Sequence, residues 1–149
     1  MKALRMAAFV AAASVIGVGT PVLAQSEYPF TDGEYVTVSR IGVEDGHDLD
    51  YAKHLAGMWR KGQDFAKAQG WITGYEILYN VHKRDGEPDI YLLTRFTRFA
   101  DPAENDRRDE AYRVHMQRTD TQMQAESGDR AKYRKLMGTT LLRKVEWKK

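Results

Sequence analysis

Two stretches of the chain alternate apolar and polar residues with the period of two that is typical of a half-buried β-strand. They cover Tyr75–Val81 and Ile90–Phe96, and the Asp85–Gly86 pair between them indicates a two-residue hairpin turn. A further strand is predicted over Glu34–Val43, which is rich in β-branched residues, and a last one over Thr139–Lys148. The apolar pattern therefore predicts four strands, two of them joined in a hairpin.

Apolar residues recur at the period of 3.6 between the first strand and the hairpin, which predicts a helix over Leu49–Gln69. Asp48 stands where an N-cap is expected, and Gly70 stands where a glycine ends a helix. Gly62 lies on the apolar stripe, although glycine costs about 1 kcal/mol against alanine inside a helix. We expect a neighbouring element to approach this helix closely at Gly62.

A second, more polar helix is predicted over Ala100–Glu126, with Asp101 as its N-cap and Pro102 at its first position. Ser127 and Gly128 are expected to break it, and a short additional helix is predicted over Asp129–Met137. The predicted order is therefore β-α-β-β-α-β. This is the ferredoxin-like arrangement of the α+β class, a four-stranded antiparallel sheet with helices packed on one face.

A turn centred on Asp85–Gly86 fixes which hairpin residues share a face, because a slip of one residue would exchange the faces. One face is apolar and is expected to pack under the helices. The other face pairs Glu76 with Arg95, Leu78 with Leu93, Asn80 with Tyr91 and His82 with Asp89. This second face is left without a helix to cover it, and a patch of that kind usually marks an interface or a ligand site. A two-fold homodimer is the commonest way to cover it.

The first residues have the composition of a cleaved secretory signal peptide. Lys2 and Arg5 precede an apolar run over Met6–Gly19, and small residues at Val22 and Ala24 form the expected cleavage pattern. We therefore expect residues 1–24 to be a signal peptide, residues 25–33 a linker and residues 34–149 one folded domain. The predicted location is the periplasm or the medium, with no stable membrane anchor after cleavage; an uncleaved anchor helix is the alternative.

The net charge depends on whether the predicted signal peptide is counted. Removing Lys2 and Arg5 from the 23 basic residues leaves 21, which equals the number of acidic residues. An exported chain with no net charge is a poor candidate for binding nucleic acid. The chain has no cysteine, so it forms no disulfide and must gain stability from core burial or from association.

In element order and size, residues Tyr35–Trp147 resemble the dimeric α+β barrel superfamily, in which the free sheet faces of two ferredoxin-like protomers close a barrel. This resemblance implies a homodimer. Members of the superfamily include cofactor-free monooxygenases and haem-handling enzymes. The haem-degrading members use an asparagine, a tryptophan and a histidine. This chain has Trp59 and His115 on its two main predicted helices, but its first predicted strand contains no asparagine, and Asn80 belongs to the second.

The uncovered hairpin face carries the side chains with the most useful chemistry. Arg95 is suited to an anionic group that Glu76 would orient, and His82 is suited to proton transfer near neutral pH. The candidate ligand-binding residues are Glu76, Asn80, His82, Tyr91 and Arg95. The structural alternative is that Glu76–Arg95 is a cross-strand salt bridge and that His82 lies at a solvated hairpin end.

Two other groups of residues contain side chains that can bind haem or a metal ion. His115 lies on the apolar stripe of the second predicted helix, where it is either a haem ligand or a partly buried core residue. His47, Asp48, Asp50 and His54 have metal-like spacing, but helix capping explains both aspartates, and we predict no metal site.

The sequence favours an exported homodimer that binds a small, partly apolar or anionic molecule on the free sheet face, with no cofactor. Alternatives are a cofactor-free monooxygenase or haem-handling enzyme, and a purely structural interaction module. Whether the protein is an enzyme stays undecided at this stage.

Overall fold

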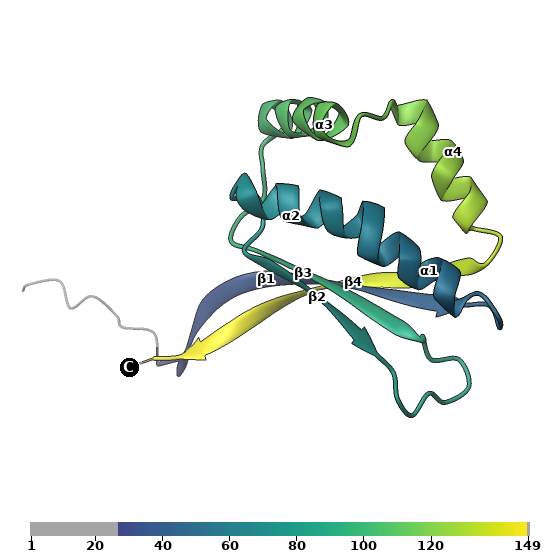
Figure 1. The fold of residues 1–149 in the computed structure, drawn as a ribbon. Coiled ribbons are helices and arrows are strands. Elements are labelled where there is room, and N and C mark those ends of the chain that lie inside the picture. Colours follow the sequence, from purple (N-terminus) through teal and green to yellow (C-terminus); the bar gives the residue numbers. More distant parts are fainter. Residues whose placement is uncertain (1–26, 149) are drawn as a thin grey trace, which may run out of the picture.

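The computed structural model describes residues 27–148, so the predicted leader lies outside the described residues. The chain forms one four-stranded antiparallel sheet in the order β2-β3-β1-β4. Figure 1 shows the helices gathered on one side of this sheet and the opposite side open. The architecture is α+β and is compatible with a ferredoxin-like fold. In the described part of the chain, no helix has both the length and the apolar character needed to cross a membrane.

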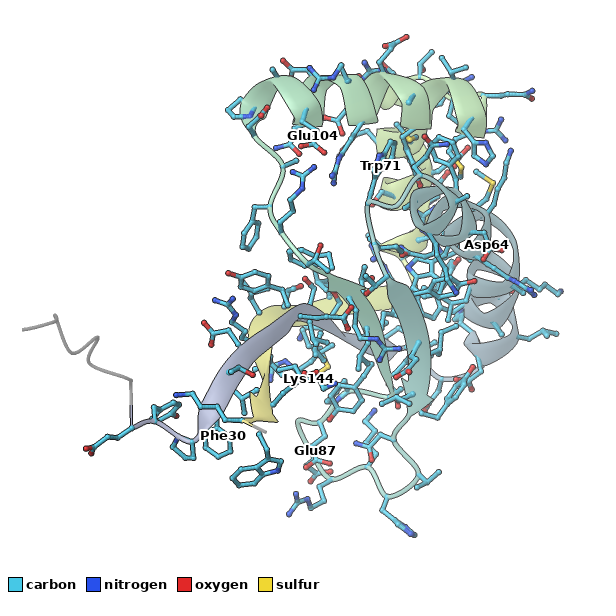
Figure 2. The ribbon with its side chains drawn as sticks, turned by 90° about the vertical axis from the view of Figure 1, so that its left-hand side faces the viewer. Phe30, Asp64, Trp71, Glu87, Glu104 and Lys144 are labelled. Atoms are coloured by element: carbon cyan, nitrogen blue, oxygen red, sulfur yellow. The ribbon has the colours of Figure 1, made fainter. Side chains whose placement is uncertain are left out.

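All four predicted strands form. They are β1 (Phe30–Val43), β2 (Gly74–Tyr79), β3 (Ile90–Phe96) and β4 (Arg134–Trp147). β1 and β4 are longer than predicted and pair with each other from Phe30 to Val43, with two register shifts along the way. They continue together beyond the ends of β2 and β3 as a two-stranded ribbon (Figure 1). Figure 2 shows Phe30 and Lys144 on this ribbon, away from the helices.

The hairpin has the predicted faces but not the predicted register. Glu76 lies opposite Leu93 instead of Arg95, and Leu78 lies opposite Tyr91 instead of Leu93. The pairing has moved by two residues, and an even shift leaves each side chain on its own face. The predicted cross-strand pairs of Asn80 with Tyr91 and of His82 with Asp89 are therefore wrong, because the strand β2 ends at Tyr79.

The turn chemistry explains the longer loop. A two-residue hairpin turn of type I′ needs a positive φ at both central residues. Gly86 has a φ of 80°, but Asp85 is not among the residues with positive φ, and the Glu87 amide donates to the Arg84 carbonyl. Asp85–Gly86 therefore makes a local turn inside a longer loop. The loop closes where the Asn80 amide donates to the Asp89 carbonyl.

The first helical segment runs from Asp48 to Ala68 as α1 (Asp48–His54), a π-helical turn η1 (Leu55–Trp59) and α2 (Arg60–Ala68). Its N-cap is His47, one residue before the predicted Asp48, and no side chain caps it. Its end is as predicted, with Gly70 at φ 71° and with amide bonds from Gly70 to the Lys67 carbonyl and from Trp71 to the Ala66 carbonyl. This pair of bonds is the Schellman motif, which satisfies the last carbonyls of the helix.

The predicted second helix is two helices, α3 (Pro102–Met116) and α4 (Asp120–Arg130). The break lies at Gln117, which adopts a left-handed conformation with φ 54°, and not at Ser127–Gly128, which are inside α4. Thr119 and Gln122 then form a reciprocal capping box that starts α4. The short helix predicted over Asp129–Met137 is absent, because β4 already begins at Arg134.

The buried core lies between the sheet and α1–η1. Its members are Ile41, Tyr51, Leu55, Ile90 and Leu92, with Val43, Trp59 and Tyr133 packed against them. α3 packs on α2 and is drawn above it in Figure 1. Phe65 of α2 stacks on His115 of α3 with ring centroids 4.1 Å apart, and the predicted close approach occurs at Gly62. A Cβ added to Gly62 would lie 2.5 Å from the Tyr112 hydroxyl.

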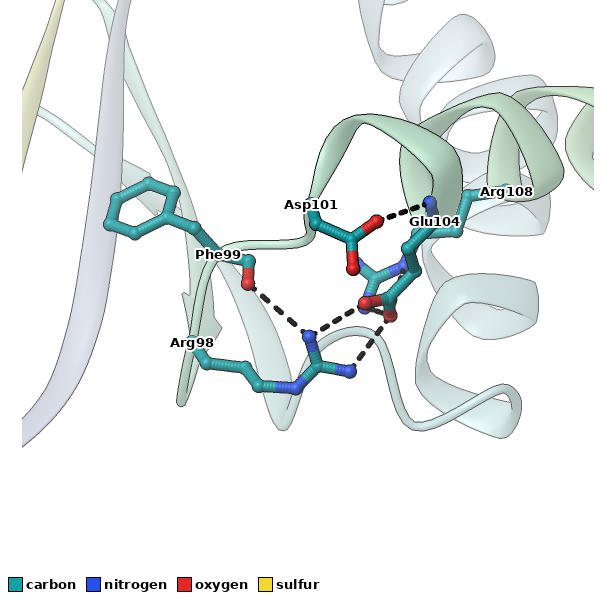
Figure 3. Close-up of polar contacts among 5 residues, drawn as sticks. All are labelled: Arg98, Phe99, Asp101, Glu104 and Arg108. Atoms are coloured by element: carbon teal, nitrogen blue, oxygen red, sulfur yellow. Dashed lines mark hydrogen bonds and ion pairs between the residues drawn. The ribbon is translucent and has the colours of Figure 1, made fainter.

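The start of α3 is held by a cluster of charged side chains (Figure 3). Asp101 accepts from the Glu104 amide, as predicted for an N-cap, at 2.7 Å. The Glu104 carboxylate accepts from Arg98 at 2.7 and 2.8 Å and from Arg108 on the next turn. Arg108 also lies over the Trp71 ring, 5.4 Å from its centroid, and Figure 2 shows Trp71 beneath α3. Hydrogen bonds from Arg98 and Arg108 lower the pKa of Glu104 from 4.5 to about 2.

The Gly62–Tyr112 contact predicts a difference between two glycines of the same helical segment. Gly62→Ala should destabilise the fold by about 1–3 kcal/mol, because the added methyl group displaces the Tyr112 ring. The matched control is Gly57→Ala, where nothing lies within 4 Å of the added Cβ and up to about 1 kcal/mol of helix propensity is gained. Urea unfolding followed by circular dichroism measures both. Equal stability of the two variants would contradict the contact.

The charged cluster predicts a pH window for the stability of α3. Because the folded pKa of Glu104 is depressed, its ion pairs stabilise the fold fully above pH 4.5 and lose this effect as the pH falls towards about 2. Glu104→Gln should therefore be less stable than the parent at neutral pH, with the difference disappearing in acid. Glu110→Gln, which removes an exposed ion pair of the same helix, is the control and should change stability little. A Glu104→Gln penalty that persists unchanged at pH 2 would refute the assignment.

Candidate functional site

The free sheet face is assembled from alternate residues of all four strands. Because side chains alternate along a strand, the register places Leu93 of β3 beside Val38 of β1 and next to Glu76 of β2. The same alternation fixes the other members of the face. The face consists of Val36, Val38, Arg40, Glu76, Leu78, Tyr91, Leu93, Arg95, Thr140 and Leu142. We call this set the free face.

The free face is apolar in its middle and remains accessible. Leu78 keeps 49% and Leu142 keeps 51% of their surface exposed. Val38, Tyr91 and Leu93 are half-buried by their neighbours within the sheet. An accessible apolar surface of this kind is a candidate interface or ligand site. Of the predicted site residues, Glu76, Tyr91 and Arg95 lie on this face.

Glu76 and Arg95 form an ion pair, although they are diagonal neighbours and not directly opposite. Arg95 Nη2 lies 2.7 Å from Glu76 Oε1, and Gly74, with no side chain, stands opposite Arg95. The hydrogen bond from Arg95 lowers the pKa of Glu76, so the pair stays charged at neutral pH. The charge of Arg95 is therefore already balanced within the face.

Arg40 is a member of the free face that the sequence-based reasoning did not include. Its guanidinium lies over Gly138, with Nη2 only 2.8 Å from the place where a Cβ would stand, and it donates to the Met137 carbonyl at 3.1 Å. Within residues 27–148, no carboxylate lies within ion-pair distance of Arg40. Gly138 lies in β4 with a φ of 127°, directly after the helix predicted over Asp129–Met137, so nothing in the sequence pattern indicated that it faces Arg40 across the sheet.

Asn80 and His82 are not on the free face. Both belong to the β2–β3 loop, where Asn80 Nδ2 donates to Glu87 Oε2 at 3.1 Å and Asn80 Oδ1 accepts from the His82 amide. Asp89 accepts from the Val43 amide at 2.9 Å and pairs with Lys83, so it is not the partner of His82. Asn80 thus organises the loop. The exposed His82 lies at a solvated hairpin end, which is the structural alternative considered for it.

His115 lies between two helices and away from the sheet. Its ring stacks on Phe65 with an angle of 10° between the planes, and it lines a shallow surface groove of α2 that also includes Lys61 and Asp64. The metal-like spacing near α1 gives no shared site either. His47 Nδ1 lies 3.0 Å from Asp50 Oδ2, and no group of three or more His, Asp or Glu side chains in the described range is arranged to hold a metal ion.

The helix side of the sheet offers a groove that the sequence-based reasoning missed. It has a volume of about 430 Å³, lies between η1 and the edge strand β2, and is lined by Ala52, Leu55, Ala56, Trp59, Arg60, Tyr75, Ile77 and Tyr79. Trp59 meets Tyr75 edge-on at 5.3 Å, and the Tyr75 hydroxyl donates to Asp64 at 2.5 Å. These residues had been assigned to a packed face, whereas β2 is an edge strand that the helix covers only in part.

Comparison of the chain with protein-family models gives no match, and comparison with curated proteins gives none either.

Proposed function

We propose that the protein is an exported homodimer whose free faces cover each other, and that the enclosed space binds a small, partly apolar or anionic molecule. The observation that carries this proposal is the accessible apolar free face opposite a sheet side that already bears every helix of the described chain. Two such faces brought together by a two-fold axis would give the dimeric α+β barrel that the sequence resembles.

The apolar part of the proposal rests on Leu78 and Leu142. Each is about half exposed, so covering the rest of each side chain contributes about half of the roughly 1.5–3 kcal/mol that full burial of an exposed leucine gives. In a two-fold dimer every residue of the face is used twice, so the gain is doubled. The ion pair of Glu76 with Arg95 is already formed within the protomer and would enter the interface as a neutral unit.

The anionic part of the proposal rests on Arg40. The charge of Arg95 is balanced by Glu76. Arg40 lies on the same face and donates a hydrogen bond to a backbone carbonyl, but it pairs with no carboxylate in residues 27–148. An arginine that is enclosed by a partner subunit needs a counter-charge, because an unpaired buried charge is costly. A carboxylate or phosphate group of a bound molecule would supply this charge and would bind guanidinium with two parallel hydrogen bonds.

The other functions considered receive less support from the geometry. A haem-handling role would use His115, which is stacked on Phe65 between α2 and α3. A cofactor-free monooxygenase would need a catalytic base near a closed pocket, and His82 is exposed in the β2–β3 loop. A purely structural module remains the alternative outcome of the ligand experiment below.

The dimer is tested by placing a charge on the free face. Leu78→Lys and Leu142→Lys should each shift the protein from dimer to monomer in sedimentation velocity, weakening association by about 2 kcal/mol or more, because a lysine would be buried twice per dimer. The matched control is Val114→Lys on α3, where an exposed apolar residue lies on a helix away from the sheet. A dimer that survives both free-face substitutions would refute this interface.

The ligand is tested by native mass spectrometry of protein purified from the periplasm. We expect a bound small molecule of constant mass on the parent dimer and its loss in Arg40→Gln, with dimer mass retained. Arg107→Gln, an exposed arginine of α3, is the control and should keep the molecule. A parent dimer that carries nothing would favour the structural module, and an Arg40→Gln dimer that still carries the same molecule would contradict the role of Arg40.

A further inference from the structure

A cavity separate from the free face lies among the helices on the other side of the sheet. It has a volume of about 170 Å³ and is bordered by α1–η1, α3 and α4. Its walls are formed by His54, Met58, Trp59, Tyr112, Met116, Met123, Glu126 and Arg130. Three methionines and a tryptophan make most of this wall apolar, and one guanidinium group stands in it.

Arg130 is a charge without a counter-charge in this cavity. Its Nε atom is buried and has no hydrogen-bond acceptor, and no carboxylate in residues 27–148 lies within ion-pair distance of its guanidinium. Glu126, the one acid of the wall, is held by Arg118 Nε at 2.8 Å. A buried polar group that the protein leaves unsatisfied requires a further explanation, such as a bound ion.

The end of α4 does not supply the missing acceptor. Although a basic residue is favoured in the last turn of a helix, the carbonyl groups there already accept from backbone amides. The Ala131 amide donates to the Ser127 and Gly128 carbonyls, and the Tyr133 amide donates to the Arg130 carbonyl. Arg130 Nε donates to none of these carbonyl groups, and Arg130 lines the cavity.

A second arginine adds to the positive potential of this region. Arg134, at the start of β4, also has a buried Nε without an acceptor, and its charge opposes the rise that burial causes in the pKa of the Tyr51 phenol. Burial, together with the charges of Arg130 and Arg134, lowers the pKa of His54 from 6.5 to about 4, against a smaller opposing effect of Glu126. At neutral pH, His54 is therefore an uncharged group beside two arginines.

We infer that this cavity binds a small carboxylate with a short apolar tail, whose carboxylate pairs with Arg130 and whose tail contacts Met58, Met116 and Met123. The charge of the wall selects an anion, and the methionine methyl groups favour an apolar tail because such side chains adapt to irregular ligands. The volume of about 170 Å³ limits the ligand to a few heavy atoms. This inference does not depend on the free face or on the dimer.

Butyrate is a suitable probe, titrated into the full-length mature protein with its methionine methyl groups labelled with ¹³C. We expect saturable shifts at Met58, Met116 and Met123 with a dissociation constant on the order of 1 mM, as expected for so small a ligand. Met137 of β4 lies outside the cavity and is the internal control. Arg130→Gln should weaken butyrate binding at least tenfold, whereas Arg107→Gln should leave it unchanged.

A second readout needs no substitution. Because Arg130, Arg134 and Glu126 are the charged groups that act on His54, a bound carboxylate should raise the pKa of the His54 imidazole, and butylammonium at the same concentration should not. Inorganic phosphate is titrated in parallel to separate a carboxylate site from a general anion site. Shifts that do not saturate, shifts shared by Met137, equal binding to Arg130→Gln, or phosphate binding tighter than butyrate would each overturn the inference.

Discussion

The structure depends on a sheet that is shielded by helices on one side only. The core between this sheet and α1–η1 is small, with Ile41, Tyr51, Leu55, Ile90 and Leu92 as its buried members. No disulfide adds to it, because the chain has no cysteine. A domain of this size therefore retains an unused apolar surface on the other side of the same strands, and covering that surface is the most direct way for the protein to gain stability. The proposed homodimer follows from this constraint and not from any single residue.

α3 forms a second helical layer on α2, outside the core between the sheet and α1–η1. α3 is fixed to α2 by the contact of Tyr112 with Gly62 and by the stacking of His115 on Phe65. Its first turn is anchored by Glu104, which joins Arg98 of the preceding loop to Arg108. α3 packs on α2, and the cavity around Arg130 lies between α1–η1, α3 and α4. The free face and this cavity thus lie on opposite sides of the sheet and are open to separate tests.

The sequence pattern was sufficient to predict the four strands, the faces of the hairpin and two of the helix ends. Asp101 caps α3 and Gly70 ends α2 because the chemistry of helix termini is local. Gly62 was correctly expected at a close contact. The hairpin register was not predictable from Asp85–Gly86 alone, because Asp85 does not adopt the positive φ that the expected turn requires. Thr119 and Gln122 already contained the capping box that divides the second helix, but the apolar stripe across it suggested one continuous helix.

The candidate site was predicted in part, because the faces of the hairpin were correct although its register was not. Glu76, Tyr91 and Arg95 lie on the free face because a two-residue shift preserves faces, whereas Asn80 and His82 fall beyond the end of β2. Arg40 was missed because its role depends on Gly138 across the β1–β4 pair, a contact between residues far apart in the chain. The most direct test of the proposed dimer, in which the two free faces cover each other, is the accessibility of the Leu78 and Leu142 methyl groups to a soluble paramagnetic probe in the mature protein. Protection of these methyl groups, with Val114 fully accessible, is the predicted result. Full accessibility of all three in the native protein would contradict it.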